Sequence, residues 1–207
     1  MAANDDRYAR EARRRELAIR LIRLEARSST ESRWSGVSRQ KVRTLPRSNA
    51  VSGVADAPKR RRGPAPHGTE MFFRTAWMRA EASAAAVLCR LYGAIPDGTT
   101  TGLKSVPTVA RGERLCDAYE TYLDLVSPAR LTFEHFVLLV DALDARETLA
   151  LENCQGCGAA LLVEPATLAR RRCESCRVTK VPEVATEPEP ELAAGETVPV
   201  AAQGELF

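Results

Sequence analysis

Residues 154–176, CQGCGAALLVEPATLARRRCESC, contain four of the chain's six cysteines, as two Cys-x-x-Cys pairs separated by 15 residues. Each pair places two thiolates on one face of a tight turn, and Gly156 and Gly158 allow backbone amides to point at sulfur. Two such turns joined by a short hairpin hold four sulfur atoms tetrahedrally, about 2.3 Å from a zinc ion. The spacing therefore predicts one structural Zn2+ per chain, bound by Cys154, Cys157, Cys173 and Cys176.

Other roles for these cysteines are less favoured by the sequence. Two disulfides require an oxidising compartment, which nothing in the chain supports, and iron–sulfur clusters usually take differently spaced cysteines. A four-thiolate zinc site leaves no position for water, so we expect the ion to pin a small subdomain and not to catalyse a reaction. The remaining cysteines, Cys89 and Cys116, lie among apolar residues in helical patterns and are predicted to be core residues.

The residues before the cysteines predict a mainly α protein. Aromatic residues make up only 5% of the chain, and Ala and Arg are abundant. Apolar residues at helical spacing predict a central buried helix that begins at Thr69 and reaches Tyr92, a second helix opened by Pro107, and a third capped by Thr132. We expect a helical, bundle-like body at 69–148 and, around the zinc, a module of short β-hairpins at 149–180 with strands near 149–151, 159–163 and 168–172.

The basic N-terminal region, residues 1–45, is predicted to be helical. Residues 5–27 predict a long arginine-rich helix with a narrow leucine stripe. Further on, Gly36 predicts a turn, and Ser38 predicts the cap of a helix that runs from Arg39 to Leu45 and ends at Pro46. This pattern has the form of a helix-turn-helix, in which the four outward side chains Arg39, Gln40, Lys41 and Arg43 could contact base edges in a major groove.

A second interpretation of that region stays open. The first helix of the pair is polar, with Glu31 and Ser35 at positions where apolar residues are wanted. The segment could then be a basic amphipathic hairpin that packs against a partner protein. Two flanking segments lack core residues: the basic loop at 46–68, predicted to be flexible, and the acidic tail at 181–207, predicted to be disordered.

Charge is unevenly distributed along the chain. Residues 1–66 hold 17 basic and 7 acidic side chains (+10), residues 67–180 hold 13 and 14 (−1), and residues 181–207 hold 6 acidic ones only (−6). A basic first part predicts a polyanionic partner. No apolar run approaches the roughly 18 residues of a membrane span, and the first residues do not resemble a signal peptide. We therefore expect a soluble, cytoplasmic protein that contacts no membrane.

Two further basic clusters are candidates for phosphate contact, although basic clusters are often only solvated surface. The candidates are Lys59, Arg60, Arg61 and Arg62 in the loop, and Arg170, Arg171, Arg172, Arg177 and Lys180 around the second cysteine pair. Catalytic motifs are missing: the two histidines, His67 and His135, stand alone, and the chain has no nucleophile elbow or phosphate-binding glycine loop. We expect neither an enzyme nor a small-molecule substrate.

The order of these segments resembles the FlhC family of flagellar transcriptional activators. The resemblance spans roughly residues 15–180 and lies in LAIRLIRLEARSSTESRWSGVSRQKVRTL, in GPAPHG followed by MFFRTAWM, in DAYETYL, in LTFEHFVLLVDAL, and in LENCQGCGAALL followed by CESC. The longer basic loop, the alanines after Trp77 and the acidic tail depart from the family pattern, as they would in a diverged paralogue.

What the resemblance implies is a zinc-binding, DNA-binding activator subunit. Such a subunit would assemble with FlhD into a heterohexamer, bind promoter DNA of flagellar and some other genes, and recruit RNA polymerase. The family's zinc ligands correspond to the same four cysteines, Cys154, Cys157, Cys173 and Cys176. The alternative from another class is a zinc-stabilised protein-interaction module that does not itself recognise promoters.

Overall fold

The computed structural model describes residues 2–50, 63–96, 106–167 and 171–178, and in these ranges the chain is mainly helical with one β-hairpin. This confirms the predicted fold class. The elements in order are α1 (Ala2–Arg23), α2 (Ser28–Ser35), α3 (Arg39–Ala50), the 3₁₀ helix η1 (Thr69–Phe73), α4 (Ala76–Leu91), α5 (Val109–Leu125), α6 (Phe133–Ala145), β1 (Ala150–Asn153), β2 (Ala160–Val163) and α7 (Glu174–Val178). The predicted acidic tail and most of the predicted basic loop lie outside the described residues.

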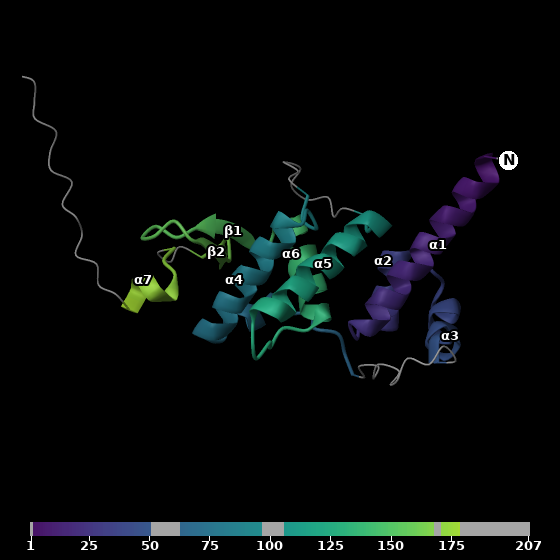
Figure 1. The fold of residues 1–207 in the computed structure, drawn as a ribbon. Coiled ribbons are helices and arrows are strands. Elements are labelled where there is room, and N and C mark those ends of the chain that lie inside the picture. Colours follow the sequence, from purple (N-terminus) through teal and green to yellow (C-terminus); the bar gives the residue numbers. More distant parts are fainter. Residues whose placement is uncertain (1, 51–62, 97–105, 168–170, 179–207) are drawn as a thin grey trace, which may run out of the picture.

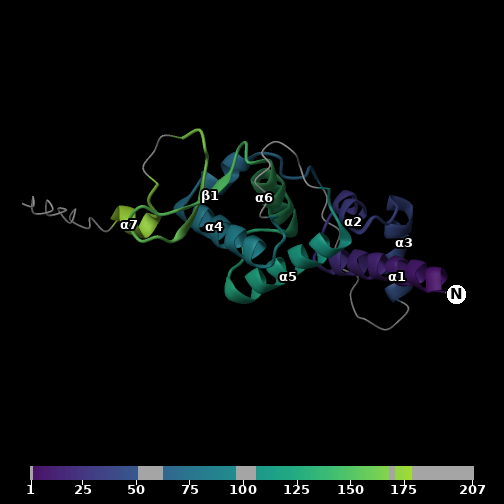
Figure 2. The same cartoon turned by 90° about the horizontal axis from the view of Figure 1, so that it is seen from above.

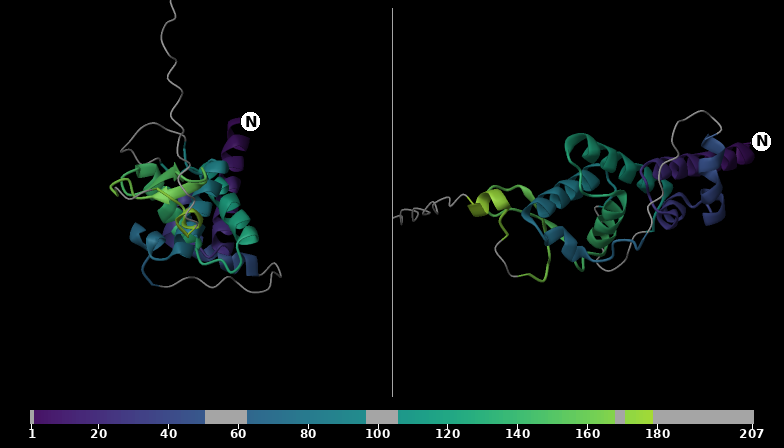
Figure 3. Two further views of the ribbon diagram at one scale, coloured as in Figure 1. Left: turned by 90° about the vertical axis from the view of Figure 1, so that its left-hand side faces the viewer. Right: turned by 90° about the horizontal axis from the view of Figure 1, so that it is seen from below.

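The elements follow one another along an elongated molecule (Figure 1). Helices α1–α3, which we call the head, occupy one end, and α4–α6 with η1 form the body in the middle. The hairpin β1–β2 and α7, which we call the cysteine module, occupy the other end. The views from above and below show the same order (Figures 2 and 3).

Aromatic rings fill the centre of the body. Tyr119 lies edge-on to Phe133 and Phe136, with ring centroids 5.3 and 4.9 Å away. Phe72 of η1 is fully buried in the same cluster, as are the alanines on the inner face of α4. The burial predicted for α4 is correct only for its inner face, where small alanine side chains let α5 and α6 approach it closely. Trp77, Val87 and Leu91 on its other face are exposed.

Threonines define where the body helices begin, though not always the predicted ones. The single helix predicted from Thr69 is wrong: η1 ends at Phe73 and α4 starts afresh, because the Thr75 hydroxyl accepts the Met78 N–H at 3.0 Å. The predicted cap Thr132 is confirmed, and it forms a capping box in which His135 Nδ1 accepts the Thr132 backbone N–H at 2.9 Å. His135 thus has a structural role in the fold.

The head is held to the body by leucines and by ion pairs. Leu17 and Leu21 of α1 are buried in the main core, as the leucine stripe predicts. Three arginines reach carboxylates on α5 and α6: Arg13 to Glu113 at 2.5 Å, Arg20 to Asp117 and Glu120 at 2.6 Å each, and Arg33 to Asp141 at 2.6 Å. Part of the basic charge of the first 66 residues is therefore neutralised within the protein.

Two predicted helix ends in the head are wrong. The helix predicted over 5–27 ends at Arg23, where Glu25 takes a positive φ of 57° and the Ala26 N–H bonds back to the Leu21 carbonyl. The helix predicted to stop at Pro46 continues to Ala50. A proline inside a helix removes one backbone hydrogen bond, and here the loss does not end the helix.

The Tyr122 hydroxyl organises the turn between α5 and α6, and its removal is testable. It accepts the backbone N–H groups of Arg130 and Leu131 at 3.1 and 3.0 Å and donates to Glu81 at 3.3 Å. We expect Tyr122→Phe to lower the free energy of unfolding by about 2–3 kcal/mol, because buried donors lose their acceptor. Urea denaturation measures this. The control Tyr92→Phe removes a more exposed hydroxyl, and equal losses in both variants would contradict the argument.

Candidate metal centre and candidate nucleic-acid interface

The four predicted cysteines converge at the far end of the cysteine module. Their sulfur atoms all lie within 4.8 Å of one another, and the sulfurs of Cys157 and Cys173 are 3.6 Å apart. Four ligands about 2.3 Å from a central zinc would be separated by roughly 3.8 Å in a tetrahedron. The cluster is therefore of the size that a metal ion such as zinc requires. Cys89 and Cys116 are buried in the body, as predicted.

The hairpin and its turn position the first cysteine pair. β1 and β2 pair antiparallel, and the pairing extends past β1 because the Cys154 N–H donates to the Ala159 carbonyl at 2.8 Å. The turn closes when the Gly158 N–H donates to the Cys154 carbonyl at 2.9 Å, with Gly158 at a φ of 73° that favours glycine. The strands predicted near 149–151 and 159–163 and the glycine turn are thus present, but the hairpin encloses the first cysteine pair and does not join the two pairs.

Backbone amides point at the Cys154 sulfur. The N–H groups of Cys173 and Gly156 donate to it at 3.2 and 3.4 Å. These donors stabilise a thiolate and lower the pKa of Cys154 to about 6. Hydrogen bonds with Cys157 and Cys173 instead raise the pKa of Cys176 to about 12. Since a coordinated thiol is deprotonated outright, a cation at the centre would make all four sulfurs thiolates.

Gly156 is the position at which a side chain would press on the cluster. A Cβ atom there would lie 2.9 Å from the Cys176 sulfur and 3.1 Å from the Cys176 Cβ. We expect Gly156→Ala to lower metal affinity by about 10- to 100-fold, as displacements around metal ligands typically do. Competition with a chelator of known affinity measures the change. Gln155→Ala, on the neighbouring exposed residue, is the control, and an unchanged affinity in Gly156→Ala would contradict the close contact.

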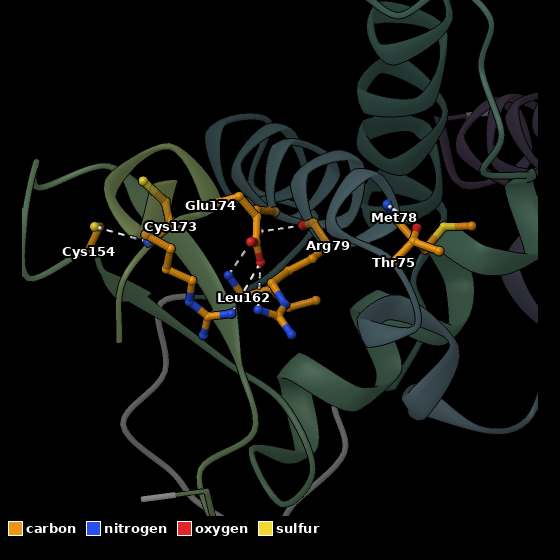
Figure 4. A network of polar contacts seen from close by, with 9 residues as sticks. Thr75, Met78, Arg79, Cys154, Leu162, Cys173 and Glu174 are labelled. Carbon is orange, nitrogen blue, oxygen red and sulfur yellow. Dashed lines mark hydrogen bonds and ion pairs between the residues drawn. The ribbon is translucent and has the colours of Figure 1, made fainter. Parts of the chain in front are cut away.

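The cysteine module is attached to the body through α4. Leu162 of β2 is 1% exposed, and its N–H donates to the Ser83 hydroxyl at 3.0 Å. Arg79, one turn earlier on α4, reaches Glu174 at the start of α7 at 2.9 Å (Figure 4). The roles of Arg79, Ser83 and Glu174 were not predictable from the sequence, because each contact joins residues about 80–95 positions apart.

Among the described basic residues around the second cysteine pair, two are paired within the module. Arg171 forms an ion pair with Glu152, and Arg177 lies 3.3 Å from Glu174. Arg172 is partly buried and forms no ion pair in the described part of the chain. Two other predicted phosphate contacts, Arg170 and Lys180, lie outside the described residues, as do all four of Lys59, Arg60, Arg61 and Arg62. The predicted strand near 168–172 is not present at residues 171 and 172.

Helices α2 and α3 are joined by a turn at Gly36, as both the helix-turn-helix and the amphipathic-hairpin interpretations predict. α2 ends at Gly36, which has a φ of 70°, and the Ser38 hydroxyl accepts the Lys41 N–H at 3.4 Å. Val42 and Leu45 are buried, as predicted, at 0% and 8% exposure. The four predicted contact residues, Arg39, Gln40, Lys41 and Arg43, are all exposed.

The expectation that α2 is too polar to pack well is wrong. Glu31 and Ser35 are buried at 1% and 0% exposure, beside the fully buried Trp34. The Ser35 hydroxyl donates to the Glu31 carbonyl at 2.5 Å, which satisfies it inside the helix. Two guanidinium groups lie over the Trp34 ring: the Cζ atoms of Arg33 and Arg111 are 5.7 and 5.5 Å from its centroid. One large ring therefore anchors an otherwise polar helix.

A carboxylate of the body fixes the start of α2. Glu134 of α6 accepts the Arg27 backbone N–H at 2.7 Å and the Thr30 hydroxyl at 2.9 Å. The helix-turn-helix is thereby oriented on the body and does not hang from a free linker. The sequence contains no signal for this role of Glu134, because an acidic residue in the first turn of a helix is already explained by its interaction with the helix dipole.

Among the described helices, none combines the length and the apolar character needed to cross a membrane. In comparisons with known proteins, no family model and no curated protein matches the chain.

Proposed function

We propose that the chain is a DNA-binding transcription-activator subunit of the cytoplasm. The observation that carries the proposal is the exposed face of α3, which follows a glycine turn and is backed by the buried Val42 and Leu45. Arg39 and Arg43 lie one turn apart on this face with Gln40 between them. Arginine binds guanine, and glutamine binds adenine, through paired hydrogen bonds in the major groove.

A zinc ion fits the four-cysteine site. Four sulfurs within 4.8 Å, with N–H donors aimed at Cys154, form a donor set typical of a closed structural site. Zinc held by Cys154, Cys157, Cys173 and Cys176 would supply folding free energy to a module with few core residues of its own. Its place at the opposite end of the molecule from α3 favours a scaffolding role over direct base contact.

The resemblance to the FlhC family supports the larger assignment. It implies an FlhD-like partner, promoter DNA as the target and RNA polymerase as the recruited enzyme. Because Glu134 of α6 holds the start of α2, DNA bound to α3 would have a defined orientation relative to a partner bound to the body.

A second function has its own supporting observation. An apolar groove of about 540 Å³ runs between α4, the end of α5 and the cysteine module, lined by Val87, Leu88, Leu125 and Leu161. The alternative function is a zinc-stabilised module that binds a partner protein in this groove and does not recognise promoters. The ion pairs of Arg171 with Glu152 and of Arg177 with Glu174 are consistent with it, because they leave these arginines less available to phosphates.

Selection from a pool of random duplexes, with and without an FlhD-like partner, distinguishes the two functions. The activator predicts enrichment of a defined sequence and affinity that falls roughly 10³-fold or more between 50 and 200 mM salt for six or more phosphate contacts. Failure of the full chain to bind any duplex under either condition would refute the activator and leave the protein-interaction module.

A further inference from the structure

A groove of about 1310 Å³ lies on the head and is lined by the first half of α1, by α3 and by the turn before α3. Its lining contains five cations, Arg7, Arg10, Arg14, Arg15 and Lys41, and two carboxylates, Glu11 and Glu16, for a net charge of +3. Helices α1 and α3 contact each other directly, so the groove is a continuous surface of the head. None of its α1 residues was among the nucleic-acid contacts predicted from the sequence.

The first half of α1 projects beyond the rest of the protein (Figure 1). Residues 6–16 are all exposed, and burial begins only at Leu17. Two of the cations in this segment have partners: Arg10 pairs with Asp6, and Arg13 pairs with Glu113 on α5 outside the groove. On the α3 side, Lys41 lies 3.5 Å from Glu11.

Three arginines of this segment form no ion pair within the part of the chain that the structure describes: Arg7, Arg14 and Arg15. Arg14 lies across the turn before α3, since a Cβ at Gly36 would be 3.8 Å from its Nε. Arg7 is seven residues earlier, two turns along the same face. A row of guanidinium groups therefore runs from the start of α3 outwards along α1.

We infer that this groove binds the phosphate backbone of duplex DNA, with Arg7, Arg14 and Arg15 as contacts that nothing in the sequence pattern assigns. The inference rests on the proposed function, and it adds a second binding element beside α3. Arginine matches phosphate geometry with paired hydrogen bonds. Contacts to phosphate carry no sequence information, so α1 fixes the position of the duplex while the outward face of α3 contacts bases.

The test uses the full chain and two labelled duplexes, one carrying the selected sequence and one scrambled. The variant Arg7→Ala/Arg14→Ala is compared with Arg74→Ala/Arg90→Ala, which removes two exposed arginines from the body. Alanine is the best helix former, so α1 keeps its helix in the variant, and circular dichroism checks this. Anisotropy titrations over a range of salt concentrations give affinities and salt slopes.

We expect Arg7→Ala/Arg14→Ala to weaken binding to both duplexes by the same factor, roughly tenfold or more, and to reduce the salt slope by about 2. The body variant should leave the slope nearly unchanged. Equal slopes in the two variants, with the wild-type chain binding normally, would overturn the α1 contact and leave the proposed function intact. A wild-type chain that binds neither duplex would overturn both.

Discussion

Replacing Cys154 with serine should leave the chain without bound zinc, the largest single effect that we expect. Cys154 makes the most contacts of the four cysteines: its sulfur accepts two backbone N–H groups, and its own N–H donates to the Ala159 carbonyl and extends the hairpin. A hydroxyl does not replace a thiolate for zinc, and metal binding supplies about 10–16 kcal/mol of folding free energy in small zinc modules. Elemental analysis should find almost no zinc in the purified variant, compared with an expected one zinc per chain in the wild type.

The structural damage in this variant should be confined to the cysteine module. The body has its own aromatic core around Tyr119 and Phe136, so helical circular dichroism should be mostly retained. Protease sensitivity should rise between the strands and α7. Cys89→Ala is the matched control, since it removes a buried cysteine from the body and should keep the zinc. Full zinc occupancy in Cys154→Ser would show that the four sulfurs do not act as one site.

The double variant Arg39→Ala/Arg43→Ala should lose sequence discrimination, the second large effect. Both side chains lie on the exposed face of α3, and no ion pair within the described residues engages them. Each paired contact to a base contributes about 1–3 kcal/mol of discrimination, so the selected duplex should bind at least about tenfold more weakly. Binding to scrambled DNA should weaken much less, because that affinity comes from phosphate contacts.

The equal-charge control for this variant is again Arg74→Ala/Arg90→Ala, which should bind both duplexes nearly as the wild type does. The ratio of the two affinities is the decisive quantity. If Arg39→Ala/Arg43→Ala lowers both affinities by the same factor, α3 contacts phosphates only, and base recognition lies elsewhere in the molecule.

Features encoded within a few residues were predictable from the sequence. The spacing of the two cysteine pairs predicts the four-cysteine cluster, and Thr132 predicts a helix cap. The turn at Gly36 and the inward Val42 follow from local conformational preference and helical periodicity. Each Cys-x-x-Cys turn, the Thr132 cap and the Gly36 turn are formed by residues close together in the sequence, so their local conformation depends little on tertiary packing.

Features that depend on distant residues were not predictable. The burial of Glu31 follows from the way Trp34 packs against Arg111, and periodicity alone favours a solvent position for an acidic residue. α4 begins after Thr75 and not after Thr69, because the preceding segment places Phe72 in the core. Likewise, a count of charges does not reveal which arginines of the head face carboxylates on α5 and α6.

The projecting half of α1 has a consequence for how affinity is determined. A helical segment of about eleven residues that buries none of its side chains is only marginally stable in water, since nucleation is costly and propagation adds little per residue. Helix formation in this segment is then coupled to DNA binding. The conformational entropy lost when the segment becomes ordered is part of the binding free energy. A residue outside the groove lining, such as Ala9, then influences affinity through its helix propensity.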